Sequence, residues 1–343
     1  GVSITYNFMI ISENYNTTDP IEFSTDFGYV AEDKDYISFT NFANDDGSAK
    51  ELTIGVIITL YNKEEYIIRA LSSVLSQTQL PEKIIIINDC STDTSLVKVS
   101  TFLAKNNVSI PVSVIDLEKN VGAAEARNIA IQKLDTDYIM FLDADDQYEN
   151  EYIKDLSTIL NHEKSVVMIM SSVKMESSSL IYPSSKINKY LKNSDNNYSI
   201  IFKPFEILSI ESLFIGGGNV CFNKSLITEL FDPNEKNFEE WNFYYSLLKE
   251  SLKRNYKLIL NHIPSYIYND IDEFSLSRKN IESHKNIVIP KLVKRLNNKE
   301  EKKYKSLLIS MWLNNAIDRL KNYKEKFLFI YNNKDIIKET CIN

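Results

Sequence analysis

The chain has 343 residues, of which 43% are apolar and 25% are charged, and its formal net charge is −8. This composition indicates a globular protein of one large domain, or of one domain with appendages, and does not favour disorder. Three cysteines and three histidines are scattered without paired spacing, so the sequence predicts neither a disulfide framework nor a zinc site. The strongest apolar stretch, residues 54–60, is too short to span a bilayer, and no signal peptide is visible.

Charge is distributed unevenly along the chain. Residues 274–343 carry 16 Lys and Arg against seven Asp and Glu, a local charge of +9, which leaves −17 on residues 1–273. A basic end on an acidic body predicts contact with an anionic partner such as phospholipid headgroups or a pyrophosphate-linked acceptor, and the alternative is a solvated helix face. No nucleic-acid partner is expected, because the acidic body would repel it and no recognition motif is present. We expect a cytoplasmic protein with peripheral contact at the inner face of the membrane. The start at Gly1 without Met indicates trimming at that end.

The first half of the chain changes character near residue 50. Residues 1–50 are expected to form an N-terminal extension of short strands and turns that ends in a linker. Beyond it, strands are expected at residues 52–60, 83–88, 112–116 and 138–142, and helices at 67–75, 94–105 and 123–134. This alternation predicts an α/β fold with a mostly parallel sheet, flanked by helices and joined by right-handed crossovers.

The second half is less regular. The apolar run at residues 166–171 predicts another strand. The polar stretch at residues 177–198 predicts a long surface loop of the kind that often forms a mobile lid. The glycines at 216–218 would let the backbone approach a ligand or another segment closely. A helix with apolar residues at helical spacing is expected to open at Phe238.

Residues 274–343 predict a basic helical C-terminal region. Its apolar residues Leu308, Trp312 and Leu320 are expected to pack the helices together or onto the preceding domain. The lysines expected to face outward are Lys302, Lys303, Lys305, Lys321, Lys324 and Lys326.

An acidic cluster follows the strand expected at 138–142. Asp143, Asp145 and Asp146 lie where an open α/β sheet presents its ligands. Carboxylates suit a hard divalent cation such as Mg²⁺ or Mn²⁺, which commonly shares them with the phosphates of a nucleotide. The alternative is an acidic turn that caps the following helix, since Asp favours such positions.

Four motifs at successive strand ends carry a family resemblance. They are Thr59-Leu60-Tyr61-Asn62, the segment 87–93 around Asp89, Asn120-Val121-Gly122 with Ala126-Arg127-Asn128, and Asp143-Ala144-Asp145-Asp146. Through them residues 52–153 resemble the donor-binding half of a family 2 glycosyltransferase of the GT-A fold, and a weaker similarity continues to about residue 277. The resemblance implies a GT-A domain over 51–273, with a nucleotide-sugar half at 51–150 and an acceptor half at 151–273.

The resemblance also implies roles for the residues of the donor half. Asp89 would accept the imide N–H of uracil, with the turn or N-cap role of an Asp as the alternative. Thr59 and Tyr61 would flank the base. Asp143 would touch the ribose or the metal, and Asp145 would coordinate Mn²⁺ or Mg²⁺ bridging the two phosphates. Arg127 lines the nucleotide pocket in the family, but it could equally brace the acidic cluster. Asp146 is expected to support its neighbours or to cap a helix.

The catalytic base is expected from the acceptor half. In the family it is commonly the acid of a Glu-Asp pair at a helix start after a glycine-rich segment. Here Glu239-Glu240 follows Gly216-Gly217-Gly218, so Glu240 stands at the position of the Asp and Glu239 is its alternative. Both could instead be exposed acids at a helix N-terminus.

A second departure from the family concerns the metal. Many members carry a metal-binding His after the last strand, and Asp270 or Asp272 would have to replace it here, or Asp145 and the diphosphate would suffice. His262 is expected to be structural.

The resemblance implies an inverting glycosyltransferase that moves a hexose or N-acetylhexosamine from a UDP-sugar to a saccharide or lipid-linked acceptor in bacterial surface-glycan synthesis. Two alternatives stay open. A nucleotidyltransferase would place a glycine-rich loop and a basic residue after the first strand, and we expect neither after Thr59. A sugar-nucleotide-binding protein without turnover is kept open by Glu240 and by the missing His.

Overall fold

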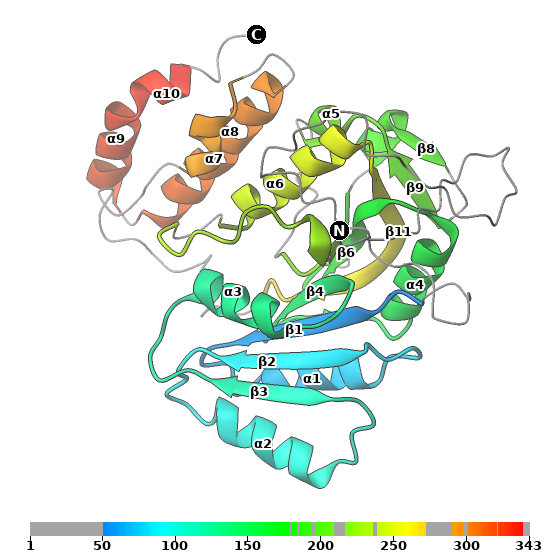
Figure 1. Cartoon of the computed structure of the whole chain (residues 1–343). Coiled ribbons are helices and arrows are strands. Elements are labelled where there is room, and N and C mark those ends of the chain that lie inside the picture. Colours follow the sequence, from blue (N-terminus) through cyan, green and yellow to red (C-terminus); the bar gives the residue numbers. More distant parts are fainter. Residues whose placement is uncertain are drawn as a thin grey trace, which may run out of the picture.

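The computed structural model describes residues 51–178, 180–183, 185–193, 197–208, 217–235, 239–271, 290–297, 301–320 and 322–338. The extension expected at 1–50, the linker within it and Asp272 lie outside these residues. Figure 1 shows a sheet with helices on both of its faces and a helical C-terminal region at one end.

The described strands and helices follow the chain in alternation through the first half. The strands are β1 (Ile54–Leu60), β2 (Lys83–Asn88), β3 (Val112–Asp116), β4 (Tyr138–Asp143), β5 (Gln147–Tyr148), β6 (Val166–Met175), β7 (Ile181–Tyr182), β8 (Leu191–Asn193), β9 (Tyr198–Ile201), β10 (Val220–Asn223) and β11 (Lys257–Tyr268). The α-helices are α1 (Ile67–Leu75), α2 (Ser95–Lys105), α3 (Ala123–Lys133), α4 (Tyr152–His162), α5 (Pro204–Leu208), α6 (Glu239–Arg254), α7 (Lys291–Arg295), α8 (Lys302–Arg319), α9 (Tyr323–Asn332) and α10 (Lys334–Lys338).

The strands form one sheet in the order β3-β2-β1-β4-β10-β6-β11-β9-β8, with β5 and β7 paired at its side. The first four strands pair with one another only in parallel, because β1 pairs in parallel with β2 and β4, and β2 with β3. Antiparallel pairs enter with β10, which lies between β4 and β6. The predicted mostly parallel sheet flanked by helices is confirmed, and Gly55↔Ile139 and Gly55↔Lys83 fix the register of its centre.

Strand β1 is buried on both faces because its side chains alternate between two cores. Ile57 packs with α3 and α6 on one face, and Val56 and Ile58 pack with α1, α2 and α4 on the other. Each fully buried side chain of this size contributes roughly 1.5–3 kcal/mol relative to an exposed one. This sheet therefore forms a rigid platform whose carboxyl edge can hold side chains in place.

The long loop expected at 177–198 is wrong for the residues that are described there. They form β7, β8, the start of β9 and a 3₁₀ helix at Ser185–Tyr190 instead. The strand β8 pairs with β9, and β9 pairs with β11, so this segment extends the sheet.

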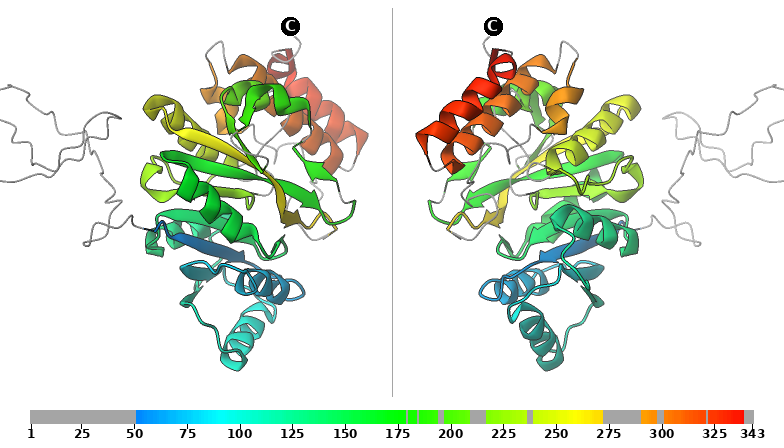
Figure 2. Two further views of the ribbon diagram at one scale, coloured as in Figure 1. Left: turned by 90° about the vertical axis from the view of Figure 1, so that its right-hand side faces the viewer. Right: turned by 90° about the vertical axis from the view of Figure 1, so that its left-hand side faces the viewer.

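The C-terminal helices pack against the rest of the protein on the side of α6. Leu308 belongs to the same core as α3 and α6, while Trp312 and Leu320 form a smaller cluster with Phe329 of α9. Tyr245 of α6 donates a hydrogen bond of 2.6 Å to the buried Glu301 before α8. Figure 2 shows these helices, in orange and red, at the end of the molecule opposite α2. Of the lysines expected outside, Lys302, Lys303 and Lys324 are exposed, Lys305 and Lys326 are half-buried, and Lys321 lies outside the described residues.

Candidate active site

The acidic turn Asp143–Asp146 follows β4 at the carboxyl edge of the sheet. Thr59 pairs with Asp143 in the β1–β4 register, and its hydroxyl donates a hydrogen bond of 2.8 Å to the Asp143 carboxylate. The backbone N–H of Ala144 also reaches the Thr59 carbonyl at 3.2 Å. Two of the predicted site residues therefore lie side by side, as expected for adjacent parallel strands.

Asp145 points back over the loop that follows β1. Its carboxylate forms an ion pair of 2.7 Å with Lys63, and both side chains are largely buried. Burial and the nearby charge of Asp143 raise the pKa of Asp145, while Lys63 opposes that shift. Two acids held together at such a site favour a bound cation, because a cation relieves their repulsion.

The third acid of the turn is held by β11. Asp146 is buried, and its carboxylate accepts hydrogen bonds from the Tyr266 hydroxyl and from the backbone N–H of Asn269. Burial, Asp145 and Asp143 raise the pKa of Asp146 well above its usual range. Of the two roles expected for Asp146, support of the turn is the one the structure gives it.

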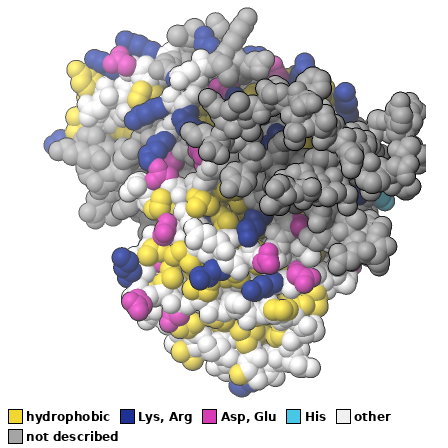
Figure 3. Space-filling model, in the orientation of Figure 1, with side chains coloured by type: hydrophobic (Ala, Val, Ile, Leu, Met, Phe, Trp, Pro, Cys, Tyr) yellow, Lys and Arg dark blue, Asp and Glu magenta, His cyan; other side chains and the backbone are white. Residues whose placement is uncertain are grey.

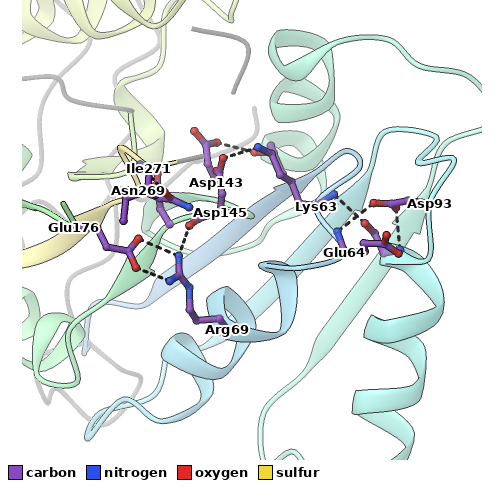
Figure 4. Close-up of polar contacts among 12 residues, drawn as sticks. Lys63, Glu64, Arg69, Asp93, Asp143, Asp145, Glu176, Asn269 and Ile271 are labelled. Atoms are coloured by element: carbon purple, nitrogen blue, oxygen red, sulfur yellow. Dashed lines mark hydrogen bonds and ion pairs between the residues drawn. The ribbon is translucent and has the colours of Figure 1, made fainter. Parts of the chain in front are cut away.

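A second clamp on the same turn comes from Arg69 of α1. Its guanidinium donates to the Asp145 carbonyl at 2.9 Å and to both oxygens of Glu176, just after β6, at 2.6 and 3.2 Å. Figure 4 shows Arg69 and Lys63 reaching the turn from different elements. Lys63, Arg69, Glu176 and Tyr266 are not among the residues predicted from sequence. The expectation that no basic residue follows Thr59 is wrong, since Lys63 is four residues on. Lys63 directly follows the first strand-end motif, and this position indicates a basic residue at the edge of the sheet.

Asp89 follows β2 and holds the turn into α3. Its two carboxylate oxygens accept the backbone N–H groups of Val121 and Gly122 at 2.7 and 2.9 Å. Gly122 has φ +87°, which suits glycine. The turn role weighed for Asp89 is therefore present, and its contact with uracil stays a prediction.

Tyr61 lies beside Asp89 at the edge of the sheet. Leu60 pairs with Asn88, and the N–H of Asp89 donates to the Leu60 carbonyl at 2.8 Å, so the residues that follow these strands are neighbours. The Tyr61 side chain is 42% exposed. An accessible ring beside the end of β2 can stack on a planar base.

Arg127 joins the acidic turn to the start of α6. It is buried, lies 2.9 Å from Asp143 and 3.4 Å from Glu239, and its guanidinium lies over the rings of Phe141 and Phe231. Burial alone would lower the pKa of Arg127, but Asp143 and Glu239 raise it, so the side chain stays charged. The structure therefore gives Arg127 the bracing role weighed for it.

Glu240 is half-buried in the first turn of α6. Burial, and then the neighbouring charge of Glu239, raise the pKa of Glu240 to about 8, while Arg127 opposes the shift. A carboxyl with such a pKa can take up a proton near neutral pH and release it again. Arg127 thus connects the acidic turn to Glu239, the neighbour of this acid-base candidate.

The glycines before α6 support the same region. Gly217 has φ +71°, and its carbonyl accepts a hydrogen bond of 2.6 Å from Tyr244. A Cβ on Gly218 would lie 2.4 Å from the ring of Tyr266, the residue that binds Asp146. Gly216 lies outside the described residues.

The other acids and histidines near β11 have structural partners. Asp270 accepts hydrogen bonds from the backbone and the hydroxyl of Ser177, and His262 lies 2.7 Å from the Ser199 hydroxyl. Within the described ranges no three His, Cys, Asp or Glu side chains cluster closely enough to hold a metal ion by themselves. Asp145 and Asp143 stay the predicted metal ligands.

The fold and the site define an α/β protein of the GT-A type, with an acidic turn at the carboxyl ends of parallel strands. The profile of Glycosyl transferase family 2 matches residues 55–231, more than half of the chain. The chain belongs to this family.

Named relatives agree with this assignment. A teichoic acid poly(glycerol phosphate) polymerase of Staphylococcus epidermidis is 27% identical over 234 residues, which cover 66% of this chain and 30% of that protein. The poly(ribitol-phosphate) beta-N-acetylglucosaminyltransferase TarS of Staphylococcus aureus is 30% identical over 123 residues, 35% of this chain and 21% of TarS. The chain thus spans less than a third of the length of these two relatives.

A solved structure supports the fold independently. The crystal structure of S. aureus TarS 1-349 in complex with UDP-GlcNAc superposes with a TM-score of 0.59 at 19% identity, and the match covers 84% of this chain and 82% of that one. The predicted GT-A fold is confirmed.

Proposed function

We propose that the protein is an inverting glycosyltransferase that moves a hexose or N-acetylhexosamine from a UDP-sugar to a saccharide or lipid-linked acceptor in bacterial surface-glycan synthesis. One observation carries the proposal. The acidic turn at the end of β4 is joined through Arg127 to Glu239, next to Glu240, which brings the expected donor-binding residues and the expected base together. The activities in the names of the S. epidermidis and S. aureus relatives support the glycan class.

The donor would lie along the carboxyl edge of the donor half. Tyr61 would stack on the uracil, and Asp89 would accept the imide N–H while it keeps its hydrogen bonds to the loop. Each carboxylate oxygen has two lone pairs, so Asp89 can accept from the loop and from the base together. Thr59 orients Asp143 toward the ribose or the metal.

Asp145 and Asp143 would hold a divalent cation, Mn²⁺ or Mg²⁺. Their paired carboxylates at a partly buried edge fit a hard cation with oxygen ligands. When bound, such an ion neutralises the charge that grows on the departing diphosphate. Lys63 is the group placed to move from Asp145 to a phosphate oxygen as the site fills.

Glu240 would take the proton from the acceptor hydroxyl. The acceptor oxygen attacks the anomeric carbon on the face opposite the diphosphate, and the bond from that carbon to the phosphate oxygen breaks. The bonding electrons leave with UDP, and the configuration at the anomeric carbon inverts. Glu239 would pair with Arg127, which also pairs with Asp143, and this pairing would fix the distance between the acidic turn and the start of α6.

The basic C-terminal region would bring the enzyme to an anionic membrane surface that carries a lipid-linked acceptor. Of the residues described in this region, none belongs to a helix long and apolar enough to cross a membrane. Basic side chains would meet anionic headgroups at the surface of the bilayer, and we assign the contact to its cytoplasmic face.

Release of UDP from a panel of UDP-sugars with Mn²⁺ or Mg²⁺ tests the proposed function. Release from one donor, raised by an acceptor glycan and accompanied by an inverted product by NMR, is the expected result. Pyrophosphate release from UTP and a sugar phosphate would identify a nucleotidyltransferase instead. Tight UDP-sugar binding without any turnover would identify a binding protein.

A further inference from the structure

Helix α9 exposes an aromatic side to solvent. Tyr323, Phe327, Ile330 and Tyr331 are 92%, 68%, 44% and 57% exposed. At about 100° per residue, this spacing places all four within roughly a third of the helix circumference. Single exposed apolar residues are ordinary, but four on one ten-residue helix form a patch that requires an explanation.

The opposite side of α9 is already used for packing. Phe329 is fully buried, its ring lies 5.1 Å from that of Trp312, and it shares a small core with Ala316 and Leu320. Helix α9 is therefore fixed to α8 by one apolar side, and the aromatic side faces away from the protein. A surface helix needs only one apolar stripe for its own fold.

Basic side chains flank the aromatic side. Lys324 follows Tyr323 by one residue in α9, which places it beside the aromatic side. Lys334 is the first residue of α10 and returns to the same rings. The Lys334 ammonium lies 4.9 Å from the Tyr331 ring, and the rings of Phe327 and Tyr331 stack at 6.2 Å. The acids of this segment are Glu325, which is half-buried, and Asp335, which pairs with Lys338 at 3.7 Å.

The C-terminal region around α9 is positively charged, like the two lysines that flank its aromatic side. The described residues beyond 290 carry 11 Lys and Arg against four Asp and Glu, a net charge of +7. In Figure 3 hydrophobic and basic side chains lie together on the outer corner where Figure 1 places α9. Aromatic rings with flanking lysines match the boundary between headgroups and acyl chains, where rings enter the apolar layer and ammonium groups stay with the phosphates.

We propose that the aromatic side of α9 (Tyr323, Phe327, Ile330 and Tyr331, with Lys324 and Lys334) docks into the headgroup region of an anionic lipid bilayer. This inference deepens the membrane contact of the proposed function by naming its surface. The rings supply apolar burial, and the lysines supply electrostatic attraction to anionic lipid. Salt screens only the electrostatic contribution, so binding from the rings should persist at high salt.

Flotation with vesicles tests the inference without any substrate. The protein is mixed with phosphatidylcholine vesicles with or without 30% or so of phosphatidylglycerol, an anionic share that gives a clearly negative surface. We expect flotation with the anionic vesicles that weakens, but does not vanish, as salt rises. The double variant Phe327→Ser/Tyr331→Ser should partition at least about tenfold less, because it loses two buried rings.

Two further variants complete the experiment. Lys324→Gln/Lys334→Gln should show a smaller preference for anionic vesicles, and Val97→Ser, which removes a 64% exposed apolar side chain from α2, should float like the wild type. Thermal unfolding of each variant confirms the fold. UDP release with a water-soluble acceptor should be unchanged in all of them, which separates the docking surface from the transferase activity.

Equal flotation of the aromatic variant and the wild type would overturn the inference, as would absence of flotation with every vesicle. Analytical sedimentation, which measures the oligomeric state, tests whether a second copy of the chain covers this side of α9 instead. A dimer that dissociates in the aromatic variant, without vesicle binding by the wild type, would assign this side of α9 to a second copy of the chain and reject the membrane.

Discussion

Arg127 lies 2.9 Å from Asp143 and 3.4 Å from Glu239, and so one buried guanidinium connects the end of β4 with the start of α6. The two carboxylates belong to the segments expected to bind the donor and the acceptor. Removing the charge between them would leave two partly buried acids without compensation, which costs more than the loss of an exposed ion pair. The arginine therefore sets the separation of the expected donor and acceptor groups.

Arg127→Met should lower kcat by about tenfold or more while the protein remains folded, because the acidic turn and α6 lose their connection. The acid limb of the pH–rate profile should also move to higher pH. Arg127 lowers the pKa of Glu240, so its loss lets that pKa rise further above 8. Arg254→Met, which removes the exposed ion pair with Glu250, is the matched control. An unchanged profile in Arg127→Met would contradict the coupling.

The pH dependence of the wild type follows from the same group. Because the pKa of Glu240 is raised to about 8, only about a tenth of it is ionised at pH 7. A base must be ionised, so kcat/KM should rise with pH through this region. Glu240→Gln should lower kcat on the order of 10²-fold or more and remove this limb. If Glu239→Gln gives the larger loss, Glu239 is the base.

Stability should show the opposite slope. Between its ordinary pKa near 4.5 and about 8, Glu240 is protonated in the folded protein and ionised in the unfolded chain. Unfolding in this window releases a proton, so this group makes the protein less stable as pH rises. The free energy of unfolding of Glu240→Gln should fall less than that of the wild type between pH 6 and 8, measured by urea denaturation.

The parallel half of the fold could be predicted from the sequence because each strand carries its own local signal. The side chains of β1 are buried on both faces, so it reads as a continuous apolar run, and the turn residues follow immediately. Once the strands are parallel and adjacent, their ends must meet at one edge, and the contact between Thr59 and Asp143 follows. No comparable rule covers β7 and β8, whose two and three residues are too short to show a period.

The clamps on the acidic turn could not be predicted for a different reason. Arg69 and Glu176 are 107 residues apart, and no periodicity links two positions on different elements. The outward rings of α9 were missed because a helical pattern assigns apolar residues to the buried side, whereas Phe327 and Tyr331 face solvent. Both features depend on how elements pack, which the sequence pattern of a single element does not contain.

The metal assignment predicts complete dependence on a divalent cation. A chelator should abolish UDP release, and added Mn²⁺ or Mg²⁺ should restore it. Asp145→Asn should abolish turnover without loss of the fold, because the amide cannot supply the same negative charge to the ion. Glu151→Gln, at an exposed ion pair with Lys154, serves as the control. Full activity of Asp145→Asn with Mn²⁺ would remove Asp145 from the metal site.

Arg69 and Glu176 are predicted to position the turn rather than to touch the substrate. Arg69→Gln should weaken Mn²⁺ binding in the presence of UDP by roughly tenfold, since the Asp145 carbonyl loses its charged donor. Glu176→Gln should have a smaller effect, and the double variant should match Arg69→Gln alone, because Glu176 acts only by orienting Arg69. Additive losses in this cycle, measured by calorimetry, would show that the two residues act separately. Arg254→Gln controls for the removal of an Arg–Glu pair.

The residues expected around the uracil predict selectivity for the base. UDP should bind more tightly than GDP or ADP with Mn²⁺ present, and equal affinities would show that the site recognises the diphosphate alone.

Two variants should separate the effect on UDP binding from the effect on the stability of the fold. Tyr61→Ala should weaken UDP binding by about 1–3 kcal/mol, the usual contribution of stacking between a base and an aromatic ring. Asp89→Asn should also weaken UDP binding, but it should lower the free energy of unfolding by about 1–3 kcal/mol as well, because the N–H groups of Val121 and Gly122 lose a charged acceptor. Tyr323→Ala, at a fully accessible ring far along the chain, controls for the loss of a tyrosine. A destabilised Asp89→Asn that binds UDP as tightly as the wild type would leave Asp89 with its role in the loop and remove it from uracil recognition.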